Sequence, residues 1–102
     1  MVEYLYDAIR CSAGVDNMIN AYITDDLAVP GNEVITDGCE FVLHDGTTDK
    51  VIGKVIGNFD TELSVWEFVL PKELTEGLRG RYKYCIMRDG QNLCFKQPIY
   101  IL

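Results

Sequence analysis

The sequence is poor in the residues that most often perform chemistry, since it holds one histidine and one tryptophan in 102 residues. Histidine is the commonest general base near neutral pH, so the sequence offers few candidates for acid–base catalysis. No apolar run approaches the roughly 18 residues that a membrane-spanning helix needs. Nine basic residues against sixteen acidic ones give a net charge of −7, the wrong sign for a groove that follows a phosphate backbone. We therefore expect no enzymatic activity, no membrane partner and no nucleic-acid partner.

Metal-binding motifs are also missing. The four cysteines form no Cys-x-x-Cys pair, and the single imidazole belongs to His44, so the usual zinc spacings do not occur and we expect no metal or other cofactor. An even number of cysteines in a secreted chain would indicate two disulfides. The acidic opening of the chain lacks a secretory signal, which predicts synthesis in the cytoplasm and free thiols. The cysteines are Cys11, Cys39, Cys85 and Cys94.

The length and composition fit one folded unit. Hydrophobic residues make up 48% of the chain, enough to build a core, and the three prolines are scattered rather than gathered in a linker. No repeat or low-complexity tract interrupts it. Residues 1–102 are therefore predicted to form a single domain.

Short runs with two-residue alternation, separated by turn residues, predict an all-β protein. About seven strands are expected, the number of an immunoglobulin-like antiparallel sandwich of this length. Pro71 opens the one segment of different character, 71–80, which predicts a short helical turn. The predicted strands are residues 3–10, 17–24, 38–44, 50–56, 64–70, 81–88 and 93–101.

Alternation also assigns one face of each strand to the core. Trp66 is predicted to lie between the sheets, with ligand stacking as the weaker alternative. Tyr82 follows a connection after Gly80 and is predicted to tie that corner to a neighbouring backbone through its hydroxyl. The residues predicted to face inward are Ile19, Ala21, Ile23, Cys39, Phe41, Leu43, Trp66, Phe68, Leu70, Tyr82, Tyr84, Ile86, Leu93, Phe95, Ile99 and Ile101.

The last predicted hairpin has a definite register. A two-residue primed turn at Asp89-Gly90 pairs Arg88 with Gln91, and every later pair follows from it. This register places two thiols opposite each other on the outer surface, where mild oxidation would join them. The further pairs are Ile86 with Leu93, Cys85 with Cys94 and Tyr84 with Phe95.

Carboxylates are the remaining candidates for chemistry, either as acid–base pairs or as calcium ligands. All lie in turn-rich sequence, where acids are mostly solvated or cap backbone amides, and no twelve-residue calcium loop is present. We therefore assign no catalytic, cofactor-binding or metal-binding residues. The acid–base candidates are Asp25 and Asp26 with Glu33, and Asp45 with Asp49; the calcium candidates are Asp25, Asp26, Asn32, Glu33 and Asp37.

Several other residues have a structural or interfacial interpretation. His44 ends a strand on its polar side and is predicted to be a surface histidine with no nucleophile tied to it. Gly53 and Gly57 predict a bulge or a close approach of another backbone. Exposed tyrosines are common at protein interfaces, and those least easily placed in a core are Tyr4, Tyr6, Tyr22 and Tyr100.

Several motifs in the second half of the chain resemble one known family. They are 41–46 (FVLHDG), 51–53 (VIG), 66–74 (WEFVLPKEL), 80–84 (GRYKY), 88–90 (RDG) and 99–101 (IYI). Over residues 38–102 this pattern is similar to the N-terminal β-sandwich modules of bacteriophage baseplate upper proteins and tail-fibre proteins. The resemblance implies a module without enzymatic activity that docks a receptor-binding device onto the phage particle. Longer family members continue into helical and receptor-binding parts.

These observations predict a structural or adaptor protein of a phage or prophage, a baseplate or tail-fibre attachment module found in the virion. We expect it to contact other phage structural proteins and to self-associate with cyclic symmetry, through an edge strand that offers unpaired backbone groups. The alternative is a small carbohydrate- or ligand-binding β-sandwich that uses aromatic residues near its loops.

Overall fold

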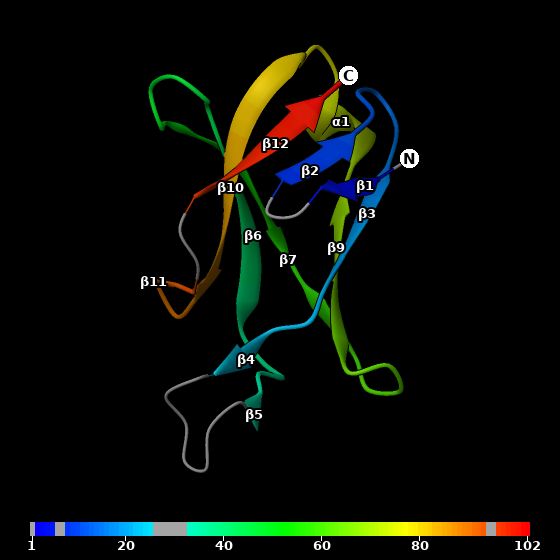
Figure 1. Cartoon of the computed structure of the whole chain (residues 1–102), viewed down its shortest axis with the longest axis vertical. Coiled ribbons are helices and arrows are strands. Elements are labelled where there is room, and N and C mark those ends of the chain that lie inside the picture. Colours follow the sequence, from blue (N-terminus) through cyan, green and yellow to red (C-terminus); the bar gives the residue numbers. More distant parts are fainter. Residues whose placement is uncertain (1, 6–7, 26–32, 94–95) are drawn as a thin grey trace.

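Two-residue alternation produces two facing sheets in the computed structural model, which describes residues 2–5, 8–25, 33–93 and 96–102. The larger sheet has the order β1-β2-β12-β10-β6-β7, with β11 paired to β10 (Figure 1). Its strands are β1 (Glu3–Leu5), β2 (Ala8–Cys11), β6 (Cys39–His44), β7 (Val51–Ile56), β10 (Gly80–Arg88), β11 (Gln91–Asn92) and β12 (Gln97–Ile101).

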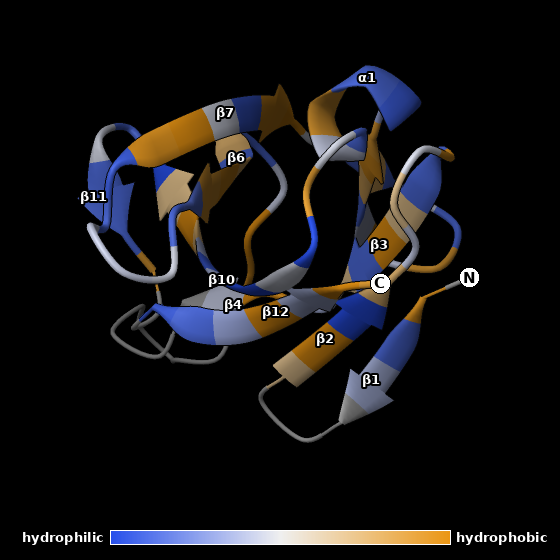
Figure 2. Cartoon of the chain, turned by 90° about the horizontal axis from the view of Figure 1, so that it is seen from above, coloured by the Kyte–Doolittle hydropathy of each residue, from blue (hydrophilic) through white to orange (hydrophobic). Residues whose placement is uncertain are grey.

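The second sheet has the order β3-β9-β8, and a two-stranded ribbon pairs β4 with β5. Viewed from above, the larger sheet curves from β7 through β10 and β12 to β1, and β3 and α1 close the remaining side (Figure 2). The bounds are β3 (Asn17–Ala21), β4 (Thr24–Asp25), β5 (Glu33–Val34), β8 (Asn58–Asp60), β9 (Val65–Leu70) and α1 (Lys72–Thr75).

This arrangement confirms the predicted all-β, immunoglobulin-like sandwich. The chain passes from the larger sheet to the second sheet after β2 and again after β7, and it returns through the β4–β5 ribbon and after β9, so each sheet is built from strands distant in sequence. Pairing is antiparallel except between β2 and β12, which run parallel. No helix in the described part of the chain is long and apolar enough to span a membrane.

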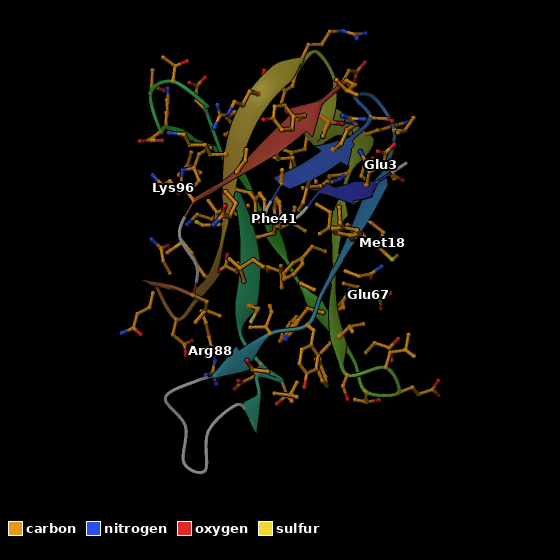
Figure 3. All side chains as sticks on the ribbon, viewed as in Figure 1. Glu3, Met18, Phe41, Glu67, Arg88 and Lys96 are labelled. Carbon is orange, nitrogen blue, oxygen red and sulfur yellow. The ribbon has the colours of Figure 1, made fainter. Side chains whose placement is uncertain are left out.

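Aromatic rings fill the space between the sheets, as the inward faces predict. Phe41 and Phe68 are fully buried, and Trp66 is 3% exposed. The ring of Phe41 lies between the sheets (Figure 3) and stacks on Tyr84 with centroids 5.0 Å apart. The indole N–H of Trp66 donates to the carbonyl oxygen of Ile35 at 2.7 Å, so its one polar atom is satisfied. Trp66 is therefore a core residue, as predicted.

The connection from β9 to β10 also follows its prediction. Pro71 is the N-cap of the single turn of α1 and has an extended backbone, with φ −67° and ψ 153°. The hydroxyl oxygen of Tyr82 accepts a hydrogen bond from the backbone N–H of Arg79 at 3.3 Å. This bond ties the corner to the start of β10, as in other immunoglobulin-like domains.

The predicted first strand, 3–10, is wrong, because these residues form two strands. β1 folds back on β2, with Tyr4 opposite Ile9, and β2 pairs in parallel with β12. Residues 6 and 7 lie outside the described residues. One continuous strand would place Tyr4 and Ile9 on opposite faces, whereas the reversal places them next to each other on the same face.

The predicted register of the last hairpin is confirmed at its turn and wrong beyond it. Arg88 pairs with Gln91, and the N–H of Leu93 donates to the carbonyl oxygen of Ile86 at 2.8 Å. Tyr84, however, faces Gln97. The shift is two residues, which preserves inward faces and is therefore invisible to a pattern of period two. Cys94 and Phe95 lie outside the described residues.

Candidate interaction surfaces

The prediction that His44 is a surface histidine is wrong. His44 is 7% exposed and lies on the outer face of the larger sheet, opposite Lys83 of β10. Its Nδ1 is 3.1 Å from the carbonyl oxygen of Asp49, and its Nε2 is 3.3 Å from Sγ of Cys85. A carbonyl oxygen only accepts, so Nδ1 donates and Nε2 accepts from the thiol.

Cys85 corrects a second prediction, since it is 1% exposed and does not lie on the outer surface. A thiol, an imidazole and a group that orients the imidazole are the parts of a nucleophilic site. A reactive thiol also needs an accessible sulfur, which this burial denies. In this arrangement the contacts satisfy both ring nitrogens of a buried histidine. The predicted crosslink to Cys94 involves a residue outside the described part of the chain.

The carboxylates Asp45 and Asp49 have separate structural partners. The pKa of Asp45 is lowered because its carboxylate accepts hydrogen bonds from the backbone N–H groups of Thr48 and Thr47, at 2.9 and 2.8 Å. The pKa of Asp49 is lowered because Lys83 donates to it at 3.1 Å and Lys96 adds a positive charge nearby. The role of Asp45 agrees with the predicted capping of backbone amides by turn acids, whereas the ion pair of Asp49 was not predicted.

The candidate calcium ligands do not form a described site. Asp25 and Glu33 are opposite each other in the backbone pairing of β4 and β5, whereas Asp26 and Asn32 lie outside the described residues. Asp37 forms an ion pair with Arg88. Within the described ranges, no cluster of three or more acidic, histidine or cysteine side chains is placed to hold a metal ion.

The two remaining described cysteines are buried in the core. Burial raises the pKa of the Cys39 thiol to about 11, and it also raises the pKa of Cys11. Both thiols therefore stay protonated near neutral pH and are poor nucleophiles.

Gly53 and Gly57 lie at a β-bulge and at a position with little space for a side chain, respectively. Leu43 pairs with Gly53 and His44 with Val51, so Ile52 is the extra residue of a bulge beside Gly53. A Cβ on Gly57 would lie 2.5 Å from a ring atom of Phe68 and 2.7 Å from one of Trp66. The bulge agrees with the prediction, whereas the close neighbours of Gly57 are core side chains rather than backbone.

The tyrosines differ in their surroundings. Tyr22 is 64% exposed and Tyr100 is half-buried on β12. Tyr4 is 51% exposed, yet its hydroxyl oxygen accepts a hydrogen bond from the backbone N–H of Asn20 at 2.7 Å. Tyr6 lies outside the described residues. The hydroxyl group of Tyr4 thus satisfies a backbone N–H at the edge of β3 that does not pair with β9.

β7 is the longest strand at a sheet edge. It has six residues and pairs with β6 on one side, and no described strand pairs with its other side. Its last residue, Ile56, is 79% exposed, the most exposed large apolar side chain of the described chain. A long edge strand with an exposed apolar residue is a template for pairing with another chain.

The hydrogen-bond pattern shows which groups of β7 point toward this edge. The N–H of Gly57 donates to the carbonyl oxygen of Cys39 at 3.0 Å, continuing the register in which Ile56 faces Glu40. Bonded and non-bonded pairs alternate in an antiparallel ladder. The N–H and C=O groups of Lys54 and Ile56 therefore point away from β6, toward the open edge.

The other sheet edges are shorter or covered. β1 and β8 have three residues each, and the N–H of Asn20 on β3 is taken by Tyr4. The sequence predicted β7 as a strand but not its place at an edge. Lys54 within an apolar strand, next to Gly53, is the signal that would have suggested it, because lysine and bulges are common on edges.

No protein-family model, curated protein or solved structure matches this chain. Function is therefore inferred from the surfaces described above.

Proposed function

We propose that the chain is a structural or adaptor module of a phage or prophage particle, of the baseplate or tail-fibre attachment type, that acts without catalysis through protein–protein contact. The open edge of β7 is the observation that carries this proposal. We infer the type of particle from the motif resemblance over residues 38–102. The chain is made in the cytoplasm and is incorporated into the virion with other phage structural proteins.

Docking takes place by strand addition. An extended segment of the partner pairs with the outward N–H and C=O groups of Lys54 and Ile56, which lengthens the larger sheet by one strand. The exposed side chain of Ile56 gives that segment an apolar contact. Backbone bonds supply affinity in this mode, and side-chain pockets of the partner supply specificity.

Lys54→Pro is expected to weaken docking strongly while the fold is retained. Proline removes an N–H that points toward the open edge and leaves the ladder with β6 intact, and edge strands tolerate proline at such positions. The readout is a benzoylphenylalanine photo-crosslinker at position 56, introduced in the producing cell during particle assembly. We expect a crosslink to a tail or baseplate protein, identified by mass spectrometry, that falls roughly tenfold in Lys54→Pro because a backbone bond is lost and the ring blocks the edge.

Two controls isolate the backbone effect. Lys54→Thr removes the same charge and keeps the N–H, so its crosslink should persist. The crosslinker at Leu63, which is 70% exposed in the turn after β8, should give little product. A crosslink that survives Lys54→Pro, or one that joins only copies of this chain, contradicts the proposed docking. Sugar binding by a chain that gives no crosslink at position 56 would favour the ligand-binding alternative.

A further inference from the structure

The outer face of the larger sheet is locally basic although the whole chain is acidic. Arg81, Tyr100 and Arg10 lie side by side on β10, β12 and β2, and Glu3 continues the row on β1. Arg10 is paired with Glu3 at 3.4 Å. Among the described residues Arg81 forms no ion pair, and it is exposed.

The neighbouring row adds further positive charge. Lys83 and Lys96 share one carboxylate, that of Asp49, at 3.1 and 3.9 Å. One carboxylate balances one of the two ammonium groups, so this row keeps a positive excess. We call the four basic residues of these two rows the basic patch; they are Arg10, Arg81, Lys83 and Lys96.

The outer face of the three-stranded sheet has the opposite character. Glu67 lies at its centre, between Asn20 and Asn58 on the adjacent strands, and Met18 faces Val69 one row away. Met18 and Val69 are 48% and 39% exposed. Met18 and Glu67 lie on the side of β3 and β9 away from Phe41, opposite the side of Lys96 (Figure 3).

β8 and β9 each carry one acidic residue, and none of the three strands of this sheet carries lysine or arginine. Asp60 stands on β8 opposite Val65. We call the acidic residues and the exposed apolar pair of this face the acidic patch; they are Asp60, Glu67, Met18 and Val69.

We propose that copies of this chain associate head to tail, with the basic patch of one copy on the acidic patch of the next. A net charge of −7 makes two copies repel in most orientations, so this orientation is selected against the others. In this contact, Tyr100 and Pro98 of the next copy cover the exposed apolar side chains of Met18 and Val69. Tyr100 and Pro98 lie on β12 beside residues of the basic patch. The two patches are different surfaces, so the contact is heterologous and builds a closed ring or an open filament.

The molecule has room for this arrangement. A stable interface covers about 800 Å² on each partner, and the chain exposes 6442 Å² in total. Neither patch includes a residue of β7. The inference therefore goes beyond the proposed docking function and uses other surfaces.

Sedimentation velocity of the full chain tests the proposal. We expect self-association that weakens as salt is raised from about 50 to about 500 mM, since the contact between patches is charged. Arg81→Glu and Glu67→Arg should each weaken association about tenfold or more by placing like charges in contact. Matched controls are Arg79→Glu and Glu73→Arg, exposed residues outside both patches that change net charge by the same amount.

Mixing identifies the head-to-tail geometry. Arg81→Glu keeps an intact acidic patch and Glu67→Arg an intact basic patch, so an equimolar mixture should restore association. Natural contacts would alternate with charge-exchanged ones, and complexes of more than two chains should form because the contact is heterologous. The double variant Arg81→Glu/Glu67→Arg should regain self-association through exchanged charges. The proposal is overturned if the reversals behave as the controls do, if the mixture stays monomeric, or if the natural chain is monomeric at about 1 mM. Those results leave the crosslinking test at position 56 unaffected.

Discussion

Trp66→Ala is expected to destabilise the protein by about 3–5 kcal/mol, the usual cost of removing a large aromatic side chain from a packed core. The indole is 3% exposed and lies 6.1 Å from the ring of Phe68 and 5.6 Å from that of Phe59, measured between ring centroids. Its removal leaves a cavity and deprives the buried carbonyl of Ile35 of its N–H donor.

The measurement is denaturant unfolding followed by far-UV circular dichroism, because the substitution removes the only tryptophan. Tyr22→Ala is the matched aromatic control, since Tyr22 is 64% exposed, and it should change the free energy of unfolding by less than about 0.5 kcal/mol. A loss below about 1 kcal/mol for Trp66→Ala would place the indole outside the core and revive a ligand-stacking role.

Gly46→Ala is expected to cost about 1–3 kcal/mol, although it adds a single methyl group. That methyl would collide with the carbonyl oxygen of Arg81 and lie 3.1 Å from its carbonyl carbon and 3.3 Å from Cα of Tyr82. These are backbone atoms of β10, and moving them displaces Tyr82 and Tyr84, which pack against the core. The loop after β6 therefore requires glycine for space.

Gly53→Ala separates this effect from a general intolerance of alanine. Its methyl would lie 2.5 Å from Cδ1 of Leu74, the end of a half-buried flexible side chain that can rotate away. Both variants are compared by thermal and denaturant unfolding. A larger loss for Gly53→Ala than for Gly46→Ala would contradict the close approach between the β6–β7 loop and β10.

The inward faces could be predicted from sequence because burial acts on alternate residues of a strand. Phe41, Trp66, Phe68 and Ile99 occupy the core for that reason. Alternation does not predict which strands lie next to each other in a sheet. The position of Gln97 opposite Tyr84 preserves side-chain parity and so leaves no trace in the pattern. The reversal between β1 and β2 places Tyr4 and Ile9 on the same face, whereas one continuous strand would place them on opposite faces.

The surfaces were harder to predict, because they depend on neighbours across the sheet. His44 lies on the polar face of its strand and is nevertheless buried, since Cys85 of β10 reaches its ring. The basic patch combines residues from β2 and β10 that are about 70 positions apart in sequence, which only the pairing through β12 brings together. The outward parity of Arg81 and Lys83 was visible in the sequence, whereas their nearness to Arg10 was not.

The two proposed contacts use separate parts of the molecule. Stacking through the basic and acidic patches would repeat the chain around a ring or along a filament, and each copy would present the edge of β7 to another particle protein. Strand addition requires that the edge be open before the partner arrives.

Amide hydrogen exchange at β7 tests this requirement most directly. In dilute isolated protein, the N–H groups of Lys54 and Ile56 should exchange on the order of 100-fold faster than those of Val55 and Gly57, which bond to β6. In the assembled particle the N–H groups of Lys54 and Ile56 should become protected. Slow exchange of Lys54 and Ile56 in the dilute protein would mean that the edge is already covered, and would contradict docking through it.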